Sequence, residues 1–395
     1  MATALVRRGQ VMNASGASVD DFDVVILGGG PAGCATALAL ARLGTLRVLV
    51  VEAGHYEAVR IGESIPPDTR AVLEQLGVWE DFLKEAHEPC LGSCSSWGDD
   101  AFGYNDFLFN PLGNGWHLDR RRFDAFLAWK VLQHGTALVK GTRFDGCERE
   151  GKGFRLRLGG GDKPTQVVNT RFVVDATGTR SSFARYMGAG RRFLDQLLCV
   201  TAFFELPGAA NFSKLTMLEA VEYGWWYAAR LPNRRIAVAV ASDPEIIKRN
   251  ALRSRDGWLD HLKATSHVRA ELAGCRFIDH SQMTCAAPSF LLDKVAGDGW
   301  LAVGDAASAY DPISSQGIYK ALSDGARAGE AIADSLRGDD ARLGEYQSSA
   351  APRFQQYLGQ RNFFYRLEQR WPASDFWTRR QARTAVPAGK QARAN

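Results

Sequence analysis

Short apolar runs alternate with segments of helical spacing near the start of the chain. Val24–Leu27 and Arg47–Val51 are rich in β-branched residues and predict two buried parallel strands. The segment between them, Ala35–Leu43, carries small and apolar residues with a helical period. A strand, a helix and a second strand in this order predict a βαβ unit, and therefore an α/β fold.

Later patterns predict the rest of the architecture. Helices are expected at 68–76, 122–132 and 316–336, with a helical and aromatic region after the last of these. Strands are expected at 137–144, 154–158 and 171–174, with a hairpin turn at 159–162. The region 200–288 has alternating strand candidates at 215–220, 225–231 and 235–241, which favour an antiparallel sheet in a second domain.

Composition and charge narrow the classes of function. The formal net charge is +4, but segment 379–395 holds five basic residues and no acid, so the remainder carries 4 − 5 = −1. A near-neutral body argues against a nucleic-acid-binding surface, and the basic segment is interpreted as a solvated tail. The chain has no apolar run near the ~20 residues of a membrane span, and no signal peptide is recognised at its start.

The seven cysteines include no CxxC pair. Cys90 and Cys94 are separated by three residues and do not by themselves form a recognised metal-binding spacing, so we expect free thiols and no bound metal. Thiols without a disulfide framework fit a reducing compartment, and we expect a cytoplasmic protein.

A glycine motif directly follows the first predicted strand. In Gly28-x-Gly30-x-x-Gly33, the first glycine permits a tight turn, the second admits a pyrophosphate and the third lets helix and strand approach. The helix that follows presents its N-terminal amides and dipole to a phosphate. Glu52 ends the second strand, where it is placed to accept hydrogen bonds from ribose hydroxyls. Together these features predict a dinucleotide site.

Two further motifs support a resemblance to a known family. Asp175-Ala-Thr-Gly178 follows a predicted strand, and Gly304-Asp305 follows another. With the first motif, these resemble the three FAD signatures of the flavin-dependent aromatic hydroxylases and halogenases. The resemblance implies an α/β chain with a Rossmann-like FAD-binding domain (GR2-type), an interleaved antiparallel-sheet substrate domain and a helical C-terminal region.

The resemblance also implies FAD as cofactor and a set of residues around it. Asp305 would bind a ribityl hydroxyl, and the helix from Gly317 would direct its positive end at the flavin's pyrimidine edge. Arg120 would lie near the adenosine or pyrophosphate, or else pair only with Asp119 or Asp124. The full implied set is Gly28, Gly30, Ala32, Gly33, Glu52, Ala53, Arg60, Arg120, Gly178, Gly304, Asp305, Ser315, Gly317 and Ile318.

The expected organisation interleaves the two domains. It comprises a flexible N-terminus (1–20), the FAD-binding domain in three parts (21–88, 117–199 and 289–337), an inserted loop and strand layer (89–116), the substrate domain (200–288), a C-terminal helical region (338–378) and a basic flexible tail (379–395). The chain has no second glycine-rich nicotinamide motif, so the electron source, NAD(P)H or a separate flavin reductase, stays open.

Within the family that the chain resembles, halogenation is disfavoured by three departures. Tryptophan halogenases use a lysine in the segment matching Pro89–Trp97, which has none here, and a glutamate where the alignment places Ser314. Their WxWxIP motif is replaced by residues 225–232, WWYAARLP. The segments GESIPP, SSWG, GWHLDRRRFD, GWWYAARLP and DPISSQGI look instead like the flavoproteins that oxidise a tryptophan of a partner polypeptide during tryptophylquinone cofactor maturation.

The leading hypothesis is therefore an FAD-dependent monooxygenase that uses O2, through a flavin C4a-hydroperoxide, to hydroxylate a tryptophan in a protein. Trp226, Tyr227 and Ser314 are the candidate pocket-lining residues, although Trp225–Tyr227 fit a sheet core equally well. His117 is interpreted as a structural histidine. A halogenase or hydroxylase of a free aromatic metabolite, and a flavin-bearing assembly chaperone without turnover, are the alternatives.

Overall fold

The parallel strands around the glycine turn form the centre of the larger sheet. The computed structural model describes residues 10–12, 18–44, 46–160, 163–208 and 211–382. The order along the sheet is β10 (Arg143–Glu150), β11 (Gly153–Gly160), β12 (Lys163–Asp175), β2 (Ser18–Leu27), β3 (Val48–Glu52) and β9 (Ala137–Lys140). β1 (Gln10–Met12) pairs with β2, β22 (Trp300–Ala302) with β12, and β21 (Ala296–Gly297) with β22.

Strand direction divides this sheet into two parts. β12, β2, β3 and β9 run parallel, and β22 runs parallel to β12, whereas β10, β11 and β12 form an antiparallel meander. Val24–Leu27 and Val48–Val51 are buried throughout, which is the pattern of strands covered on both faces. The predicted βαβ unit and α/β fold are confirmed. Of the hairpin turn predicted at 159–162, Gly161 and Asp162 lie outside the described residues.

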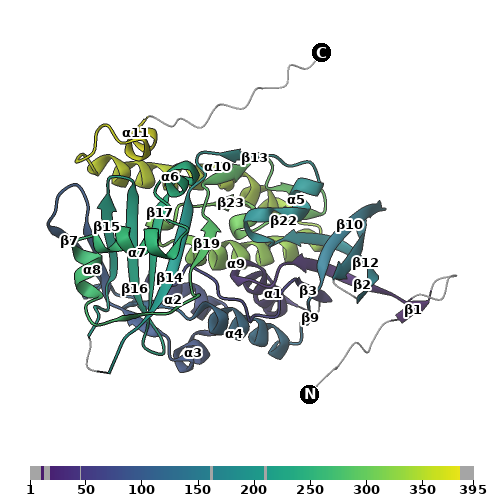
Figure 1. The fold of residues 1–395 in the computed structure, drawn as a ribbon. Helices are drawn as coiled ribbons and strands as arrows, with labels where there is room; N and C mark the ends of the chain where they lie inside the picture. Colours follow the sequence, from purple (N-terminus) through teal and green to yellow (C-terminus); the bar gives the residue numbers. More distant parts are fainter. Residues whose placement is uncertain (1–9, 13–17, 45, 161–162, 209–210, 383–395) are drawn as a thin grey trace, which may run out of the picture.

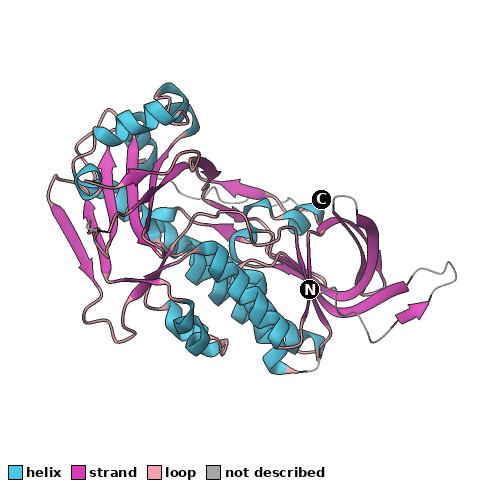
Figure 2. Ribbon diagram, turned by 60° about the horizontal axis from the view of Figure 1, so that its bottom comes forward, coloured by secondary structure: helices cyan, strands magenta, loops and turns pink. Residues whose placement is uncertain are grey.

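Helices cover one face of the parallel strands (Figures 1 and 2). They are α1 (Pro31–Leu43), α4 (Arg120–Gln133) and α9 (Gly317–Leu336), and the shorter α2 (Thr69–Gln75) and α3 (Trp79–Phe82) pack beside them. α1 and α9 approach closely because small residues meet at their crossing: a Cβ on Gly325 would lie 2.4 Å from the Ala32 carbonyl oxygen. This contact fixes the start of α9 beside the glycine turn.

The second sheet lies on the left in Figure 1. Its order is β18 (Arg276–Phe277), β14 (Leu198–Glu205), β17 (Arg235–Ser242), β16 (Gly224–Leu231), β15 (Thr216–Val221), β6 (Gly92–Ser96) and β7 (Phe102–Asp106), with β19 (Met283–Ala286) beside β14. α6 (Pro244–Arg249), α7 (Arg255–Lys263) and α8 (His267–Glu271) follow β17 in the chain. The layer expected as an insertion at 89–116 contributes β6 and β7 to this sheet, where β6 runs parallel to β15.

Smaller elements link the two sheets. β4 (Ser64–Ile65), β8 (Gly115–His117) and β5 (Glu88–Cys90) form one short sheet; β13 (Arg191–Phe193), β20 (Phe290–Leu292) and β23 (Ser308–Ala309) form another. α5 (Ser182–Tyr186) and 3-10 turns at Leu83–Glu85, Gly178–Arg180, Gly304–Ala306 and Pro312–Ser314 complete the connections. None of the helices among the described residues has the length and apolar character that crossing a bilayer requires.

The C-terminal region is helical, as predicted, but its end differs from the prediction. α10 (Ala341–Leu367) and α11 (Asp375–Gln381) pack over the second sheet at the top of Figure 1. Arg380 is buried and bonds Asp243 at 2.6 Å, while Arg379 bonds Asp243 at 3.0 Å. The folded body therefore extends past 379, because these two guanidiniums neutralise acids next to α6. Residues 383–395 of the predicted tail, and 1–9 and 13–17 of the predicted N-terminal segment, lie outside the described residues.

Candidate functional site

The turn between β2 and α1 leaves a gap where a pyrophosphate would lie. Gly28 has φ +114°, and a Cβ there would meet the Ala176 carbonyl oxygen at 2.2 Å. A Cβ on Gly33 would lie 1.9 Å from the Gly28 oxygen, so this position fixes helix against turn. Gly30 differs, because a Cβ there would meet nothing within 4 Å. It is also the N-cap of α1, and no side chain caps that helix end. The helix amides are left for an anion.

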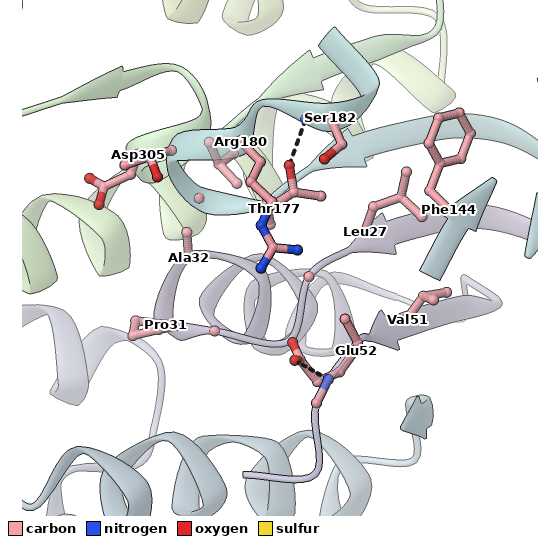
Figure 3. A pocket seen from close by; sticks show the side chains of 18 of the residues that line it. Leu27, Pro31, Ala32, Val51, Glu52, Phe144, Thr177, Arg180, Ser182 and Asp305 are labelled. Atoms are coloured by element: carbon pink, nitrogen blue, oxygen red, sulfur yellow. Dashed lines mark hydrogen bonds between the residues drawn. The ribbon is translucent and has the colours of Figure 1, made fainter. Parts of the chain in front are cut away.

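Glu52 holds the loops on either side of this turn. Its Oε2 accepts a hydrogen bond from the Gly29 amide at 2.7 Å. Its Oε1 accepts from the Gly54 amide at 2.7 Å (Figure 3). The side chain is 6 % exposed and lines the cavity. A carboxylate with two amide donors stays fixed in orientation and retains lone pairs for ribose hydroxyls.

Four arginines bring positive charge to the same cavity: Arg60, Arg120, Arg143 and Arg180. Arg120 pairs with Asp124 at 3.2 Å, donates to the Ile61 carbonyl at 2.8 Å and lines the cavity. Arg60 lies 3.7 Å from Glu52 and 3.8 Å from Asp124. Arg180, which the sequence analysis did not single out, extends into the cavity from the turn after β12 (Figure 3).

The second motif, Asp175–Gly178, shapes the cavity indirectly. Asp175 is fully buried and accepts hydrogen bonds from the Thr177 amide, the Thr177 hydroxyl and the Ala184 amide at 3.0, 2.6 and 2.8 Å. Burial raises the pKa of its carboxyl. The aspartate thereby fixes a turn that places Gly178, with φ +64° and open space at its Cβ position, on the cavity wall.

The third motif places Asp305 at the far end of the cavity. Gly304 has φ +57°, and a Cβ there would lie 2.8 Å from the Ala32 side chain. Asp305 follows and lines the cavity, with Lys320 Nζ 3.7 Å from its Oδ1. Burial raises the pKa of the Asp305 carboxyl, and the nearby charge of the buried Lys320 opposes that rise.

These residues enclose a cavity of about 620 Å³ that fits FAD. Gly28, Gly30, Ala32, Glu52, Ala53, Arg60, Arg120, Gly178 and Asp305 line it, and Gly33 and Gly304 lie just behind its wall. The open Cβ direction at Gly30, the uncapped helix end and the fixed carboxylate of Glu52 are the features that the adenosine and pyrophosphate half of FAD requires.

The start of α9 lies between this cavity and a second one. Ala321 of α9 lines the first cavity, whereas Ser315 and Gln316, just before the helix, line the second. Gln316 makes no side-chain cap, and a Cβ on Gly317 would meet nothing within 4 Å. The positive end of a 20-residue helix therefore opens at the junction. Ile318 is 7 % exposed and packs in the core behind it.

The second cavity, here called the substrate pocket, has a volume of about 1250 Å³. Its wall combines β4, β6, β7, the start of β15, the loop before α9 and one face of α10. Its lining side chains include Ser64, Trp97, Thr216, Ser314, Arg361 and Phe363. The pocket thus draws on residues up to 303 positions apart in the chain, 64 to 367.

A chain of hydrogen bonds runs from the pocket wall into the protein. Ser64 Oγ lies 3.1 Å from Thr216 Oγ1 and 2.9 Å from the Tyr227 hydroxyl, and Thr216 Oγ1 lies 2.8 Å from His117 Nε2. His117 is fully buried, and this burial lowers its pKa to about 4. Burial raises the pKa of Tyr227. Both groups are therefore neutral at pH 7, and the chain can donate and accept hydrogen bonds without carrying charge. We call these four residues the polar row.

The three predicted pocket-lining residues have different positions. Ser314 lines the substrate pocket, and Tyr227 reaches it through Ser64. Trp226 does not: it is fully buried and packs on Trp258 with ring centroids 5.0 Å apart. Neighbouring residues of a strand face opposite sides, so Trp226 points away from the face that carries Tyr227. The aromatic wall predicted at 225–227 is wrong for Trp226.

Trp225 and the loop before α9 are tied to the C-terminal region. Trp225 Nε1 donates to the Tyr365 hydroxyl at 3.1 Å, which donates to Asp311 at 2.8 Å. Arg361, 3 % exposed, bonds Asp195 at 2.5 Å and Asp311 at 3.3 Å. Asp311 is the first residue of the DPISSQG segment, so α10 fixes the loop that separates the two cavities.

Ser64 and Thr216 of the polar row and the α10 side chains were missed in the sequence. Ser64 and Thr216 have no motif around them that indicates contact across 152 positions, and Phe363 resembled one more apolar helix residue. Arg230 and Arg234 do not line this pocket: Arg230 pairs with Glu88 at 3.0 Å, and Arg234 donates to the Leu206 carbonyl. Over the described ranges, no three metal-ligating side chains converge.

Comparison with known proteins agrees with this geometry. A family model described as an FAD binding domain matches residues 21–360. LodB of Marinomonas mediterranea, named "Putative FAD-dependent oxidoreductase LodB", is 30 % identical over 369 residues, which cover 93 % of this chain and 99 % of LodB. A brominase of Pseudoalteromonas luteoviolacea, named for 1H-pyrrole-2-carbonyl on a peptidyl-carrier protein, is 27 % identical over 333 residues, covering 81 % and 79 % of the two chains.

Among solved structures, the myxobacterial chondrochloren halogenase CndH superposes with a TM-score of 0.83 at 22 % identity. The match covers 92 % of this chain and 86 % of CndH. At that identity the likeness shows a common fold, with sheets and helices arranged as in the halogenases, and says nothing about substrate.

Proposed function

The chain belongs to the FAD binding domain family of flavin-dependent oxidoreductases, and from that premise we propose that it hydroxylates the tryptophan side chain of a partner polypeptide during quinone cofactor maturation. Bound FAD supplies the redox chemistry with dioxygen. The chain's own residues bind the flavin, orient the ring that is oxidised and exclude water with the help of the partner.

The observation that carries this proposal is the wide substrate pocket with an apolar mouth. Exposed apolar side chains stand on β7, on the loop after it and on α10; we call them the apolar rim, comprising Tyr104, Leu108, Phe109, Phe363, Phe364 and Leu367. Phe109 is 93 % exposed and Tyr104 69 %. Exposed apolar patches of this kind mark surfaces that another macromolecule covers. A partner seated there would close the pocket and keep water from the reacting ring.

The charges in the pocket support a side chain within a polypeptide over a free amino acid. A free amino acid needs a cation for its carboxylate, in addition to groups for its side chain. Among the described residues of the pocket wall, Arg361 is the one cation, and its guanidinium already binds Asp195 and Asp311. A tryptophan inside a polypeptide has no free carboxylate, so this arrangement suits it.

The polar row gives the pocket a means of orienting an indole. Ser64 and Thr216 place two linked hydroxyls on the pocket wall, and neutral His117 behind them accepts or donates through Thr216. An aromatic ring with an N–H would bind to this point and be held by its edges, whereas a plain hydrocarbon ring would leave the hydroxyls unpaired. The relative named for a carrier-protein substrate supports the idea that this architecture accepts rings borne on a protein.

Halogenation of an aromatic ring is the second candidate, and the halogenases among the relatives favour it. The pocket argues against it, because the described wall contains no lysine and has Ser314 in place of a carboxylate. An assembly chaperone without turnover is the third.

One experiment separates these functions. The purified, flavin-loaded protein is given a reductant, oxygen, bromide and the precursor of a tryptophylquinone-bearing subunit, and the products are weighed by mass spectrometry. We expect the mass of added oxygen at one tryptophan. Added bromine would establish halogenation, and an unchanged but tightly bound precursor would establish a chaperone; either result would refute the proposal.

A further inference from the structure

Two cysteines face each other where the chain passes between the FAD-binding half and the second sheet. Cys199 lies on β14 and Cys285 on β19, and the two strands are antiparallel with these residues directly opposite in register. Residues opposite each other on adjacent strands point to the same face of a sheet. Here that face is the one that carries Trp225 and Tyr365, and both cysteines belong to this cluster.

The position in the chain is as informative as the register. β14 follows β13 of the FAD-binding half, and β19 precedes β20, which pairs with β13. The segment 199–285 therefore leaves the FAD-binding half through one cysteine and returns to it through the other. A covalent bond between them would close this segment into a loop at its base.

Backbone geometry allows that bond. Opposite residues of antiparallel strands have Cα atoms about 4.5 or 5.5 Å apart, and disulfides span about 4.4–6.8 Å. Both cysteines are free thiols in this structure. No other pair of the seven stands opposite one another in the strand pairings of the described residues.

The two thiols differ in reactivity. Cys285 is partly exposed, and its hydrogen bond with Cys199 lowers its pKa. Cys199 is 6 % exposed, and the same hydrogen bond, with burial, raises its pKa well above the usual range. Glu63 lies near both groups and Asp311 near Cys199, and each raises the pKa of the thiol that it faces. The asymmetry is that of an attacking thiolate and a resolving thiol.

We propose that Cys199 and Cys285 form a peroxide-sensitive dithiol that closes to a reversible disulfide. The Cys285 thiolate attacks one oxygen of hydrogen peroxide, the O–O bond breaks, and a sulfenic acid and one water form. The Cys199 sulfur then attacks the Cys285 sulfur, the S–O bond breaks, and a second water leaves. Two thiols lose two electrons and two protons, and one peroxide is reduced to two waters.

The oxidant is at hand in any flavoprotein that reduces oxygen. Reduced flavin that meets O2 without transferring oxygen to a substrate releases hydrogen peroxide. The inference depends only on the FAD-dependent redox chemistry of the family and not on the identity of the substrate. When the enzyme reduces oxygen without transferring it to a substrate, the disulfide would therefore join β14 to β19 at the edge of the second sheet nearest the FAD-binding half.

The test uses the flavin-loaded full chain, hydrogen peroxide as the probe, and Cys275→Ser as the matched control, because Cys275 is also partly exposed. After peroxide treatment and alkylation of remaining thiols, peptide mass spectrometry should find Cys199 joined to Cys285, with the loss of two hydrogen atoms. Dithiothreitol should restore both thiols. Cys275→Ser should behave as wild type, and Cys285→Ser should form no cross-link.

Cys199→Ser adds a readout that simple proximity would not give. Without its resolving partner, the Cys285 sulfenic acid should persist and be captured by dimedone. The proposal is overturned if Cys285 in the wild type stays as alkylatable as Cys275 after peroxide, or if Cys199→Ser yields no dimedone adduct at Cys285.

Discussion

The cavity that fits FAD and the substrate pocket are built from different parts of the chain. The first is formed largely by main-chain turns at the ends of β2, β3, β12 and β22, each belonging to a short continuous motif. The second is formed by side chains from residues 64–68, from β6 and β7, from the start of β15 and from α10. The start of α9 is the element between the two.

This difference explains what each cavity tolerates. A site made of backbone amides and glycines binds its ligand only if no side chain fills the space. A single added carbon atom can therefore abolish binding there. A site made of scattered side chains depends on hydrogen bonds and apolar area, so single changes weaken it by degrees. The following variants test that contrast, beginning with the largest effect.

Gly30→Val should give a folded protein that no longer retains FAD. A Cβ at Gly30 meets no protein atom within 4 Å and its φ is −78°, so valine fits the protein alone but fills the space of the pyrophosphate. We expect FAD affinity to fall at least about 100-fold, or roughly 2.7 kcal/mol. Absorbance of the purified protein and titration with FAD measure this. Gly344→Val, on an exposed turn of α10, is the control. Full flavin occupancy of Gly30→Val would mean that the pyrophosphate lies elsewhere.

His117→Gln should reduce the dependence of the free energy of unfolding on pH between about 6.5 and 4. The folded-state pKa of His117 is about 4 and the unfolded value is about 6.5. The unfolded chain therefore binds the extra proton first, and stability that is complete above pH 6.5 is lost as pH falls toward 4. The loss is roughly 3 kcal/mol for this group. Glutamine does not titrate and keeps an acceptor for Thr216.

Denaturant unfolding at several pH values checks this prediction, with exposed His134→Gln as control. Burial raises the pKa of Glu63 to about 7, so Glu63 acts in the opposite direction, with stability falling as pH rises from about 4.5 to 7. Because that contribution is common to all variants, the difference between profiles isolates His117. Identical slopes for wild type and His117→Gln would contradict a buried neutral histidine.

Ser64→Ala and Thr216→Val should impair oxygen transfer while leaving FAD bound. Each removes one member of the polar row, and a lost hydrogen bond in a closed site costs about 1.4 kcal/mol, or about 10-fold in kcat/KM. Ser95→Ala, another serine of the pocket wall outside the polar row, is the matched control. The peroxide released per flavin oxidised should rise in the two variants and not in the control. Unchanged coupling in all three would remove the polar row from substrate positioning.

Phe363→Ser should weaken binding of the polypeptide substrate alone. The side chain is 59 % exposed on the apolar rim, and a rim contact contributes about 1 kcal/mol, or about five-fold in KM. Leu132→Ser, which is 50 % exposed on α4, serves as control. Equal KM values for both variants and wild type would show that the partner does not use this surface.

The two cavities also differ in how far the sequence could predict them. The turn from Gly28 to Gly33 and the acid Glu52 lie within one βαβ unit, so local spacing determines their arrangement, and the structure brings them together at one cavity. Helix α9 was predicted almost to the residue because small and apolar positions repeat along its 20 residues.

The substrate pocket was less accessible to prediction, for physical reasons. Successive residues of a strand face opposite sides of the sheet. In Trp225-Trp226-Tyr227 both sides carry aromatic residues, so the sequence contains no alternation of polar and apolar positions. It therefore could not show that Trp226 belongs to the core. Ser64 and Thr216 meet only because β4 and β15 are brought together by the fold. Arg379 and Arg380 looked like tail residues since their partners, Asp243 and Glu245, lie over 130 positions away.

The central claim is that the site acts on a ring within a polypeptide, and the coupling of oxygen use to product tests it most directly. Reduced enzyme is mixed with ¹⁸O2 and either free tryptophan or the precursor polypeptide, and hydrogen peroxide and labelled product are counted in each. With free tryptophan we expect nearly all oxygen to appear as peroxide; with the polypeptide, labelled oxygen should appear at one tryptophan and peroxide should fall. Efficient labelling of free tryptophan would contradict the account.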